Sequence, residues 1–123
     1  YGLVGSEMCI RDSNNIVQPS SLSKEQLDSV ISLYSIGKIK EAIVEINTLT
    51  ENHSDSPLLF NILGACYKKL GHIDSSVKMF AKAVTINPDY AEAHFNHAIV
   101  LNEIGKTGSS IKSYKKAMAL LPN

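Results

Sequence analysis

Apolar residues recur at helical spacing across residues 22–121, and the pattern is interrupted at regular places. Three glycines separated by 34 residues mark the sharpest breaks: Gly37, Gly71 and Gly105. Between them, polar or proline-containing stretches interrupt the pattern again. A unit of about 34 residues holds two helices and a turn, and it buries its apolar face by stacking on the next unit. The pattern therefore predicts six helices in three hairpins.

The second unit shows this organisation most clearly. Ser56 is expected to cap its first helix, Pro57 suits the first helical position, and Gly71 can end the helix in a left-handed conformation. A partner helix is expected at about residues 73–86, before Asn87 and Pro88. The stripes expected to pack together are Phe60, Leu63, Gly64 and Tyr67 on the first helix and Ser76, Phe80 and Ala83 on the second.

The flanking units repeat the pattern less perfectly. In the third unit, His97 occupies a position where the second has an apolar Leu63. Asp89 is expected to cap this hairpin. Gly108 should make the last helix fray at its start, because an interior glycine costs about 1 kcal/mol relative to alanine. The first unit keeps Val30, Leu33, Ala42, Ile46 and Leu49.

These positions resemble the tetratricopeptide repeat. The matching residues are Gly64, Tyr67, Ser76, Phe80, Ala83 and Pro88 in the second unit and Ala98, Leu101, Ser110, Tyr114, Ala117 and Pro122 in the third. The resemblance implies an all-α fold, a right-handed superhelical stack of three antiparallel helix–turn–helix hairpins, or α-solenoid. It covers residues 23–123, with repeats at about 23–56, 57–90 and 91–123.

The first residues differ in character from this array. Residues 3–12 resemble a sequencing adapter translated in one frame, so residues 1–13 are interpreted as a non-native leader, with a native tail as the alternative. Residues 14–22 are polar, contain Pro19 and are expected to form a linker. With the apolar last helix uncovered, the chain resembles the interior of a longer reading frame.

Composition narrows the function classes. The 123 residues carry 12 basic and 12 acidic side chains, so nothing indicates a nucleic-acid or anionic-membrane partner. No apolar run approaches the roughly 20 residues of a membrane helix, and the two cysteines are too few for a disulfide framework. A cytoplasmic protein is expected.

Catalytic chemistry has little support. No phosphate loop, dinucleotide fingerprint or metal-hydrolase motif is present. His94 and His97 lie three residues apart on one helix, and Cys66 could approach them, which allows a zinc-site hypothesis. Both histidines occupy packing positions of the repeat, which favours packing. We therefore expect no metal, no cofactor and no enzyme activity.

The family resemblance implies a binding surface on the concave side, lined by the first helix of each hairpin. Its predicted residues are Tyr34, Asn61, Ala65, Lys68, Lys69, Phe95, Asn96, Ile99, Asn102 and Glu103, with Leu27 and Ile31. An apolar floor with amide groups suits an extended peptide or partner segment. Related repeats clamp the carboxylate tail of chaperones with lysines and asparagines. Here Leu27, Ile31, Glu92 and Asn96 occupy four of those positions, so that tail is not the expected partner.

The leading hypothesis is a non-catalytic scaffold that binds a protein or peptide in this groove. The alternative is the N-terminal repeat region of a larger bacterial enzyme, of the sulfotransferase, methyltransferase, glycosyltransferase or oxygenase type. Weak self-association through the uncapped last helix is a further hypothesis. Its surface would be formed by Ile111, Tyr114, Met118 and Leu121.

Overall fold

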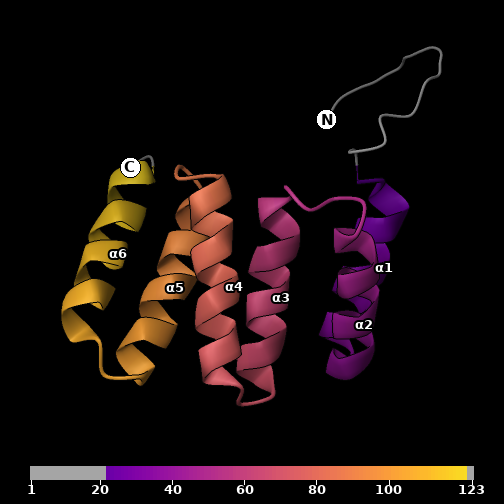
Figure 1. Cartoon of the computed structure of the whole chain (residues 1–123), viewed down its shortest axis with the longest axis horizontal. Coiled ribbons are helices and arrows are strands. Elements are labelled where there is room, and N and C mark those ends of the chain that lie inside the picture. Colours follow the sequence, from indigo (N-terminus) through magenta and orange to yellow (C-terminus); the bar gives the residue numbers. More distant parts are fainter. Residues whose placement is uncertain (1–21, 122–123) are drawn as a thin grey trace, which may run out of the picture.

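The computed structural model describes residues 22–121, and within this range all regular structure is helical. The leader, the linker up to residue 21 and Pro122 lie outside the described residues. The six helices are α1 Lys24–Ser35, α2 Ile39–Thr50, α3 Pro57–Lys69, α4 Ile73–Ile86, α5 Ala91–Glu103 and α6 Thr107–Leu120. They stand side by side as a row of three antiparallel hairpins (Figure 1), which confirms the predicted all-α helical-repeat solenoid.

The turn inside each hairpin is built the same way. Gly37, Gly71 and Gly105 have φ of 87°, 81° and 85°, the left-handed region that glycine adopts without strain. The residue after each glycine donates its N–H to a carbonyl five residues back; for His72 this is Tyr67, at 2.9 Å. These bonds satisfy carbonyls at the end of the first helix and form the Schellman motif. The predicted role of the three glycines is confirmed.

The predicted cap at the start of α3 is confirmed, whereas the predicted cap at the start of α5 is not. Ser56 Oγ accepts the N–H of Leu59 at 3.4 Å, and Pro57 opens α3, as predicted. The predicted Asp89 cap on α5 is wrong, because the N-cap residue is Tyr90 and it makes no side-chain cap bond. Asp89 instead donates its N–H to Asn87 Oδ1 at 3.1 Å, in the turn that precedes the helix.

Small residues bring the two helices of a hairpin close together. Ser76 Oγ on α4 donates to the Gly64 carbonyl on α3 at 2.7 Å, and the Phe80 ring covers Gly64. Ser110 on α6 repeats the bond to Ala98 on α5 at the same distance. Both serines are buried. In the first hairpin the corresponding residue is Ala42, which has no hydroxyl, so this bond is confined to the second and third hairpins.

Candidate partner-binding groove

The first helices of the three hairpins border two adjoining hollows, of about 270 and 410 Å³. Tyr34 of α1, Ala65 of α3 and Asn96 of α5 line both, so the hollows form one groove that crosses the array. The remaining lining residues are Ile31, Asn61, Ile62 and Glu92 in the smaller hollow and Lys68, Lys69, Phe80 and Ile99 in the larger. Ile62 and Phe80 were not among the residues predicted from the sequence.

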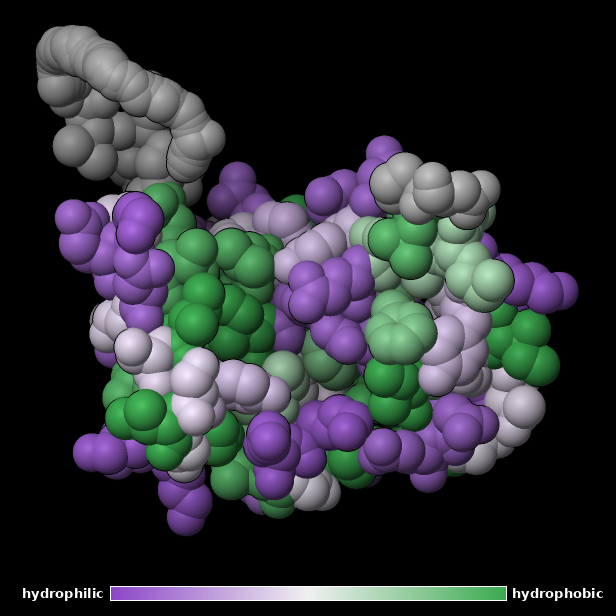
Figure 2. All heavy atoms as spheres, turned by 180° about the vertical axis from the view of Figure 1, so that it is seen from behind, coloured by the Kyte–Doolittle hydropathy of each residue, from purple (hydrophilic) through white to green (hydrophobic). Residues whose placement is uncertain are grey.

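The surface around these helices mixes apolar and polar side chains. Viewed from behind the row of helices, apolar residues gather towards the α1–α2 end, and polar residues lie across the middle (Figure 2). Ala65 and Ile99 are half-buried, and they provide apolar floor within the larger hollow. Such a lining can contact side chains of a partner while polar groups bind its backbone.

A chain of hydrogen bonds crosses the groove floor. Asn96 Nδ2 donates to Asn61 Oδ1 at 3.1 Å, and Asn61 Nδ2 donates to the Tyr90 hydroxyl at 3.2 Å. Burial raises the pKa of Tyr90, and the negative charge of Glu92 adds to this effect. Asn61 is only 5% exposed, so its amide mainly orients Asn96 instead of facing a partner. Asn96 lines both hollows, and its bond to Asn61 uses only one N–H of its side-chain amide.

Two lysines connect neighbouring hairpins along the groove. Lys69 Nζ lies 5.9 Å from the centre of the Tyr34 ring, and Lys68 Nζ lies 3.7 Å from Glu103 Oε2. Both lysines are exposed, so each contact contributes no more than about 1 kcal/mol. Because these two contacts are weak, either lysine could exchange its contact for an ion pair with an acidic group of a partner.

Four predicted groove residues lie outside the two hollows, and Leu27 of α1 is one of them. Asn102 and Glu103 are exposed near the end of α5, where Glu103 pairs with Lys68. Phe95 is 48% exposed, and its ring meets Tyr114 of α6 edge to face at 5.4 Å between centroids. Phe95 therefore belongs to the surface of the third hairpin, beyond the hollow part of the groove.

The zinc hypothesis gains no support from the geometry. His94 Nε2 lies 2.7 Å from the Pro88 carbonyl oxygen and is held there by a hydrogen bond. Cys66 is fully buried in the main apolar cluster, and burial raises the pKa of its thiol to about 11. Within residues 22–121, no three His, Cys, Asp or Glu side chains lie close enough to hold a metal ion.

Protonation of His97 is expected to weaken the fold at acid pH. Its partial burial lowers its pKa, and the nearby His94 contributes in the same direction. Below the ordinary pKa of about 6.5, the unfolded chain therefore binds this proton more readily than the folded chain. Stability should fall as the pH drops from about 6.5 through the lowered folded-state value, while above 6.5 this group has no effect.

Urea unfolding at a series of pH values measures this effect. His97→Leu, which introduces the residue of the second repeat, should flatten the acid limb of the stability curve. The exposed His72 provides the control variant His72→Gln, which should leave that limb in place. An unchanged acid limb in His97→Leu would contradict the assignment.

A larger hollow of about 520 Å³ lies on the first hairpin, apart from the groove. It is lined by Leu33, Lys40, Glu41, Val44, Glu45 and Thr48. Val44 is 65% exposed there. The hollow involves only α1 and α2, so it does not share the groove's continuity across the hairpins.

The fold and the groove together define a protein of the helical-repeat class, in which stacked hairpins present one continuous surface. A family model described as tetratricopeptide repeat matches residues 59–90. A TPR repeat-containing protein of Methanocaldococcus jannaschii is 31% identical over 71 residues, which are 58% of this chain and 22% of that protein. Residues 59–90 therefore carry a tetratricopeptide repeat, and the chain spans about a fifth of the length of this curated relative.

Solved structures share the same arrangement of helices. The second TPR domain of Spaghetti (RPAP3), bound to an HSP90 peptide, superimposes with a TM-score of 0.76 at 16% identity. The match covers 79% of this chain and 90% of that one. The Yersinia enterocolitica secretion chaperone SycD, in complex with a peptide of the translocator YopD, gives 0.76 at 19% identity, covering 81% and 76%. At these identities the likeness establishes the fold alone.

Among the helices of residues 22–121, none is both long enough and apolar enough to cross a bilayer.

Proposed function

We propose that this protein is a non-catalytic interaction module that binds an extended peptide or a partner segment in the groove. The observation that carries the proposal is the continuity of the two hollows across α1, α3 and α5. A segment lying along this groove could contact all three hairpins at once. The peptides bound by proteins of similar structure support the same mode of use.

The groove chemistry indicates how such a segment would be held. Asn96 offers both an acceptor and a donor, which can pair with one peptide unit of the partner. The apolar floor at Ala65 and Ile99 accommodates an apolar side chain, and Lys68 and Lys69 favour an acidic one beside it. The partner segment should therefore combine an apolar and an acidic side chain in extended backbone.

Filling the groove tests this proposal. Short peptides would be selected from a random library displayed on phage, then synthesised and measured by fluorescence anisotropy. Ala65→Arg places a long side chain where both hollows meet, and it should weaken binding by about tenfold or more. The control Val44→Arg fills the separate hollow on α1 and α2 and should preserve binding.

Circular dichroism would verify that both variants keep the helical content of the wild type. If the selected peptides bind Ala65→Arg as well as the wild type, the groove is not the binding site. If only Val44→Arg loses binding, the peptide binds in the separate hollow on α1 and α2.

The larger-enzyme alternative draws on the length of the relative, of which this chain spans about a fifth. In that case the hairpins would bind a partner for a catalytic domain elsewhere in the protein. Reading the genomic frame beyond Asn123 tests it, since a nucleotide-binding or metal-binding motif downstream would favour the enzyme. A cytoplasmic location, and partners other than nucleic acid or membrane, remain part of the proposal.

A further inference from the structure

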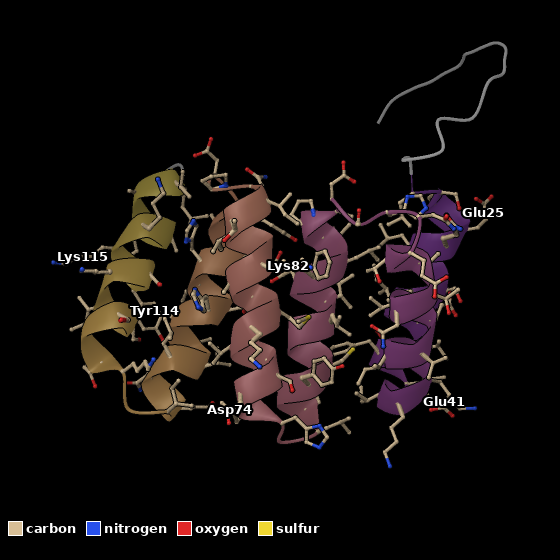
Figure 3. The ribbon with its side chains drawn as sticks, in the orientation of Figure 1. Glu25, Glu41, Asp74, Lys82, Tyr114 and Lys115 are labelled. Carbon is tan, nitrogen blue, oxygen red and sulfur yellow. The ribbon has the colours of Figure 1, made fainter. Side chains whose placement is uncertain are left out.

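The third hairpin exposes an apolar surface that the groove does not include. Ile111 is 48% exposed and Met118 is 71% exposed on α6. Beside them, Tyr114 contacts Phe95 of α5, which is itself 48% exposed. We call these four residues the α6 face. Figure 3 shows Tyr114 on α6, at the end of the array opposite α1.

The same repeat positions are covered one hairpin earlier. Moving back by 34 residues, the α6 face corresponds to Val77, Phe80, Val84 and Asn61. Phe80 and Asn61 are buried, and Val77 and Val84 are partly buried. The element next to them is α5, which packs against both α4 and α3. The array therefore contains an example of a helix seated on this type of surface.

The helix that covers the earlier position has a defined chemistry. α5 places Ala93, which is fully buried, into the cluster that also contains Ala83 of α4. Residues 89–103, which span α5, carry the acids Asp89, Glu92 and Glu103 and no lysine or arginine. The covering helix is thus acidic, and it meets α4 with a small apolar residue.

The charge on α6 is of the opposite sign. Lys106, Lys112, Lys115 and Lys116 lie in or beside this helix, and residues 104–121 contain no acid. Lys115 stands where α4 has the small Ala81, and it points away from the array (Figure 3). A helix seated on the α6 face would meet this positive charge, which favours carboxylates on the incoming helix.

A second copy of this chain fits the α6 face poorly. Two copies paired through α6 would bring their lysines together, at an electrostatic cost. A copy stacked head to tail would present α1, in which Glu25 occupies the position of the buried Ala93. Glu25 is exposed at the opposite end of the array (Figure 3). Neither arrangement supplies an apolar stripe with acidic flanks.

We propose that the α6 face binds an amphipathic helix of a partner protein, with a small-residue apolar stripe against Ile111, Tyr114 and Met118 and a carboxylate near Lys115. This site is separate from the groove and does not depend on groove binding. The apolar stripe supplies burial, and the carboxylate sets the orientation of the helix.

A synthetic peptide of residues 89–103 is the probe, because it carries the acidic α5 sequence with Ala93 at the contact position. Titrated into the whole chain labelled with ¹⁵N, it should shift the amide resonances of α6 at up to about millimolar concentration. A second peptide with Asp89→Asn, Glu92→Gln and Glu103→Gln should bind several-fold more weakly. Shifts confined to α4, or none at all, would overturn the proposal.

Variants of the protein distinguish a partner helix from the two other possible occupants of the α6 face, a second copy of the chain and a membrane. Met118→Glu and Lys115→Glu should each weaken peptide binding several-fold, whereas Lys78→Glu, on an exposed position of α4, should not. If the peptide does not bind, and light scattering shows a dimer that Met118→Glu dissociates, the occupant of the α6 face is a second copy of the chain. If only phosphatidylserine vesicles bind, and Lys115→Glu abolishes that binding, the face is a membrane contact.

Discussion

Replacing Phe80 with alanine is expected to lower the free energy of unfolding by about 3–5 kcal/mol. Phe80 is 1% exposed, lies against Gly64 within the second hairpin and also lines the groove. Removing its ring leaves a cavity between α3 and α4 that the serine–carbonyl bond between these helices keeps from collapsing. For a domain of about 100 residues, the loss should lower Tm by more than about 12 °C.

The matched control is Tyr114→Ala, at the same position of the third repeat. Tyr114 is only partly buried, because no hairpin in the described part of the chain covers α6. Its truncation should therefore cost clearly less than that of Phe80. Thermal and urea unfolding of the two variants provide the comparison. Equal losses would mean that the central hairpin is no more tightly packed than the terminal one.

The turns could be predicted from the sequence because their cause is local. A left-handed residue at the end of a helix favours glycine strongly, so the 34-residue interval of Gly37, Gly71 and Gly105 located all three hairpins. The cap of α5 could not be located as well. Asp89 and Tyr90 differ by one position, and only the observed bond to Asn87 shows that Asp89 precedes the cap.

The groove was accessible to sequence reasoning only in part. Repeat position selected residues on the first helices of the hairpins, and eight of the twelve predicted residues line the hollows. The repeat position of Asn61 could not show that its side-chain amide forms hydrogen bonds through both its nitrogen and its oxygen. Its partners, Tyr90 and Asn96, lie 29 and 35 residues away in the sequence. Such pairings depend on how the hairpins stack, and a repeat pattern does not encode them residue by residue.

The uncovered surface of the third hairpin follows from a difference between repeats. The pattern predicted that Ile111, Tyr114, Met118 and Leu121 would have incomplete cover, and three of these four side chains are exposed in the structure. What the pattern did not show is the contrast with α1, whose polar Glu25 closes the other end of the array. The two ends of the described array, α1 and α6, are therefore chemically different, which is why the helix-binding proposal concerns α6.

Substituting Gly64 with alanine should destabilise the protein, although alanine favours a helix over glycine by about 1 kcal/mol. A Cβ at this position would lie 2.7 Å from the Phe80 ring, too close for any real contact, so the ring or the two helices would have to shift. Overpacking of this kind costs about 1–3 kcal/mol, so the steric term is expected to exceed the gain in propensity. The Ser76 bond to the Gly64 carbonyl would also lengthen if α3 and α4 moved apart.

Gly108→Ala provides the opposite case within the same chain. Gly108 lies near the start of α6, and a Cβ added there meets nothing within 4 Å. Only the propensity term then acts, so this variant should stabilise the protein by up to about 1 kcal/mol and slow hydrogen exchange at the start of α6. Combining Gly64→Ala with Phe80→Leu should recover part of the first loss, because the smaller side chain relieves the contact. If urea unfolding shows Gly64→Ala to be as stabilising as Gly108→Ala, the close approach of α3 and α4 is not a constraint on this fold.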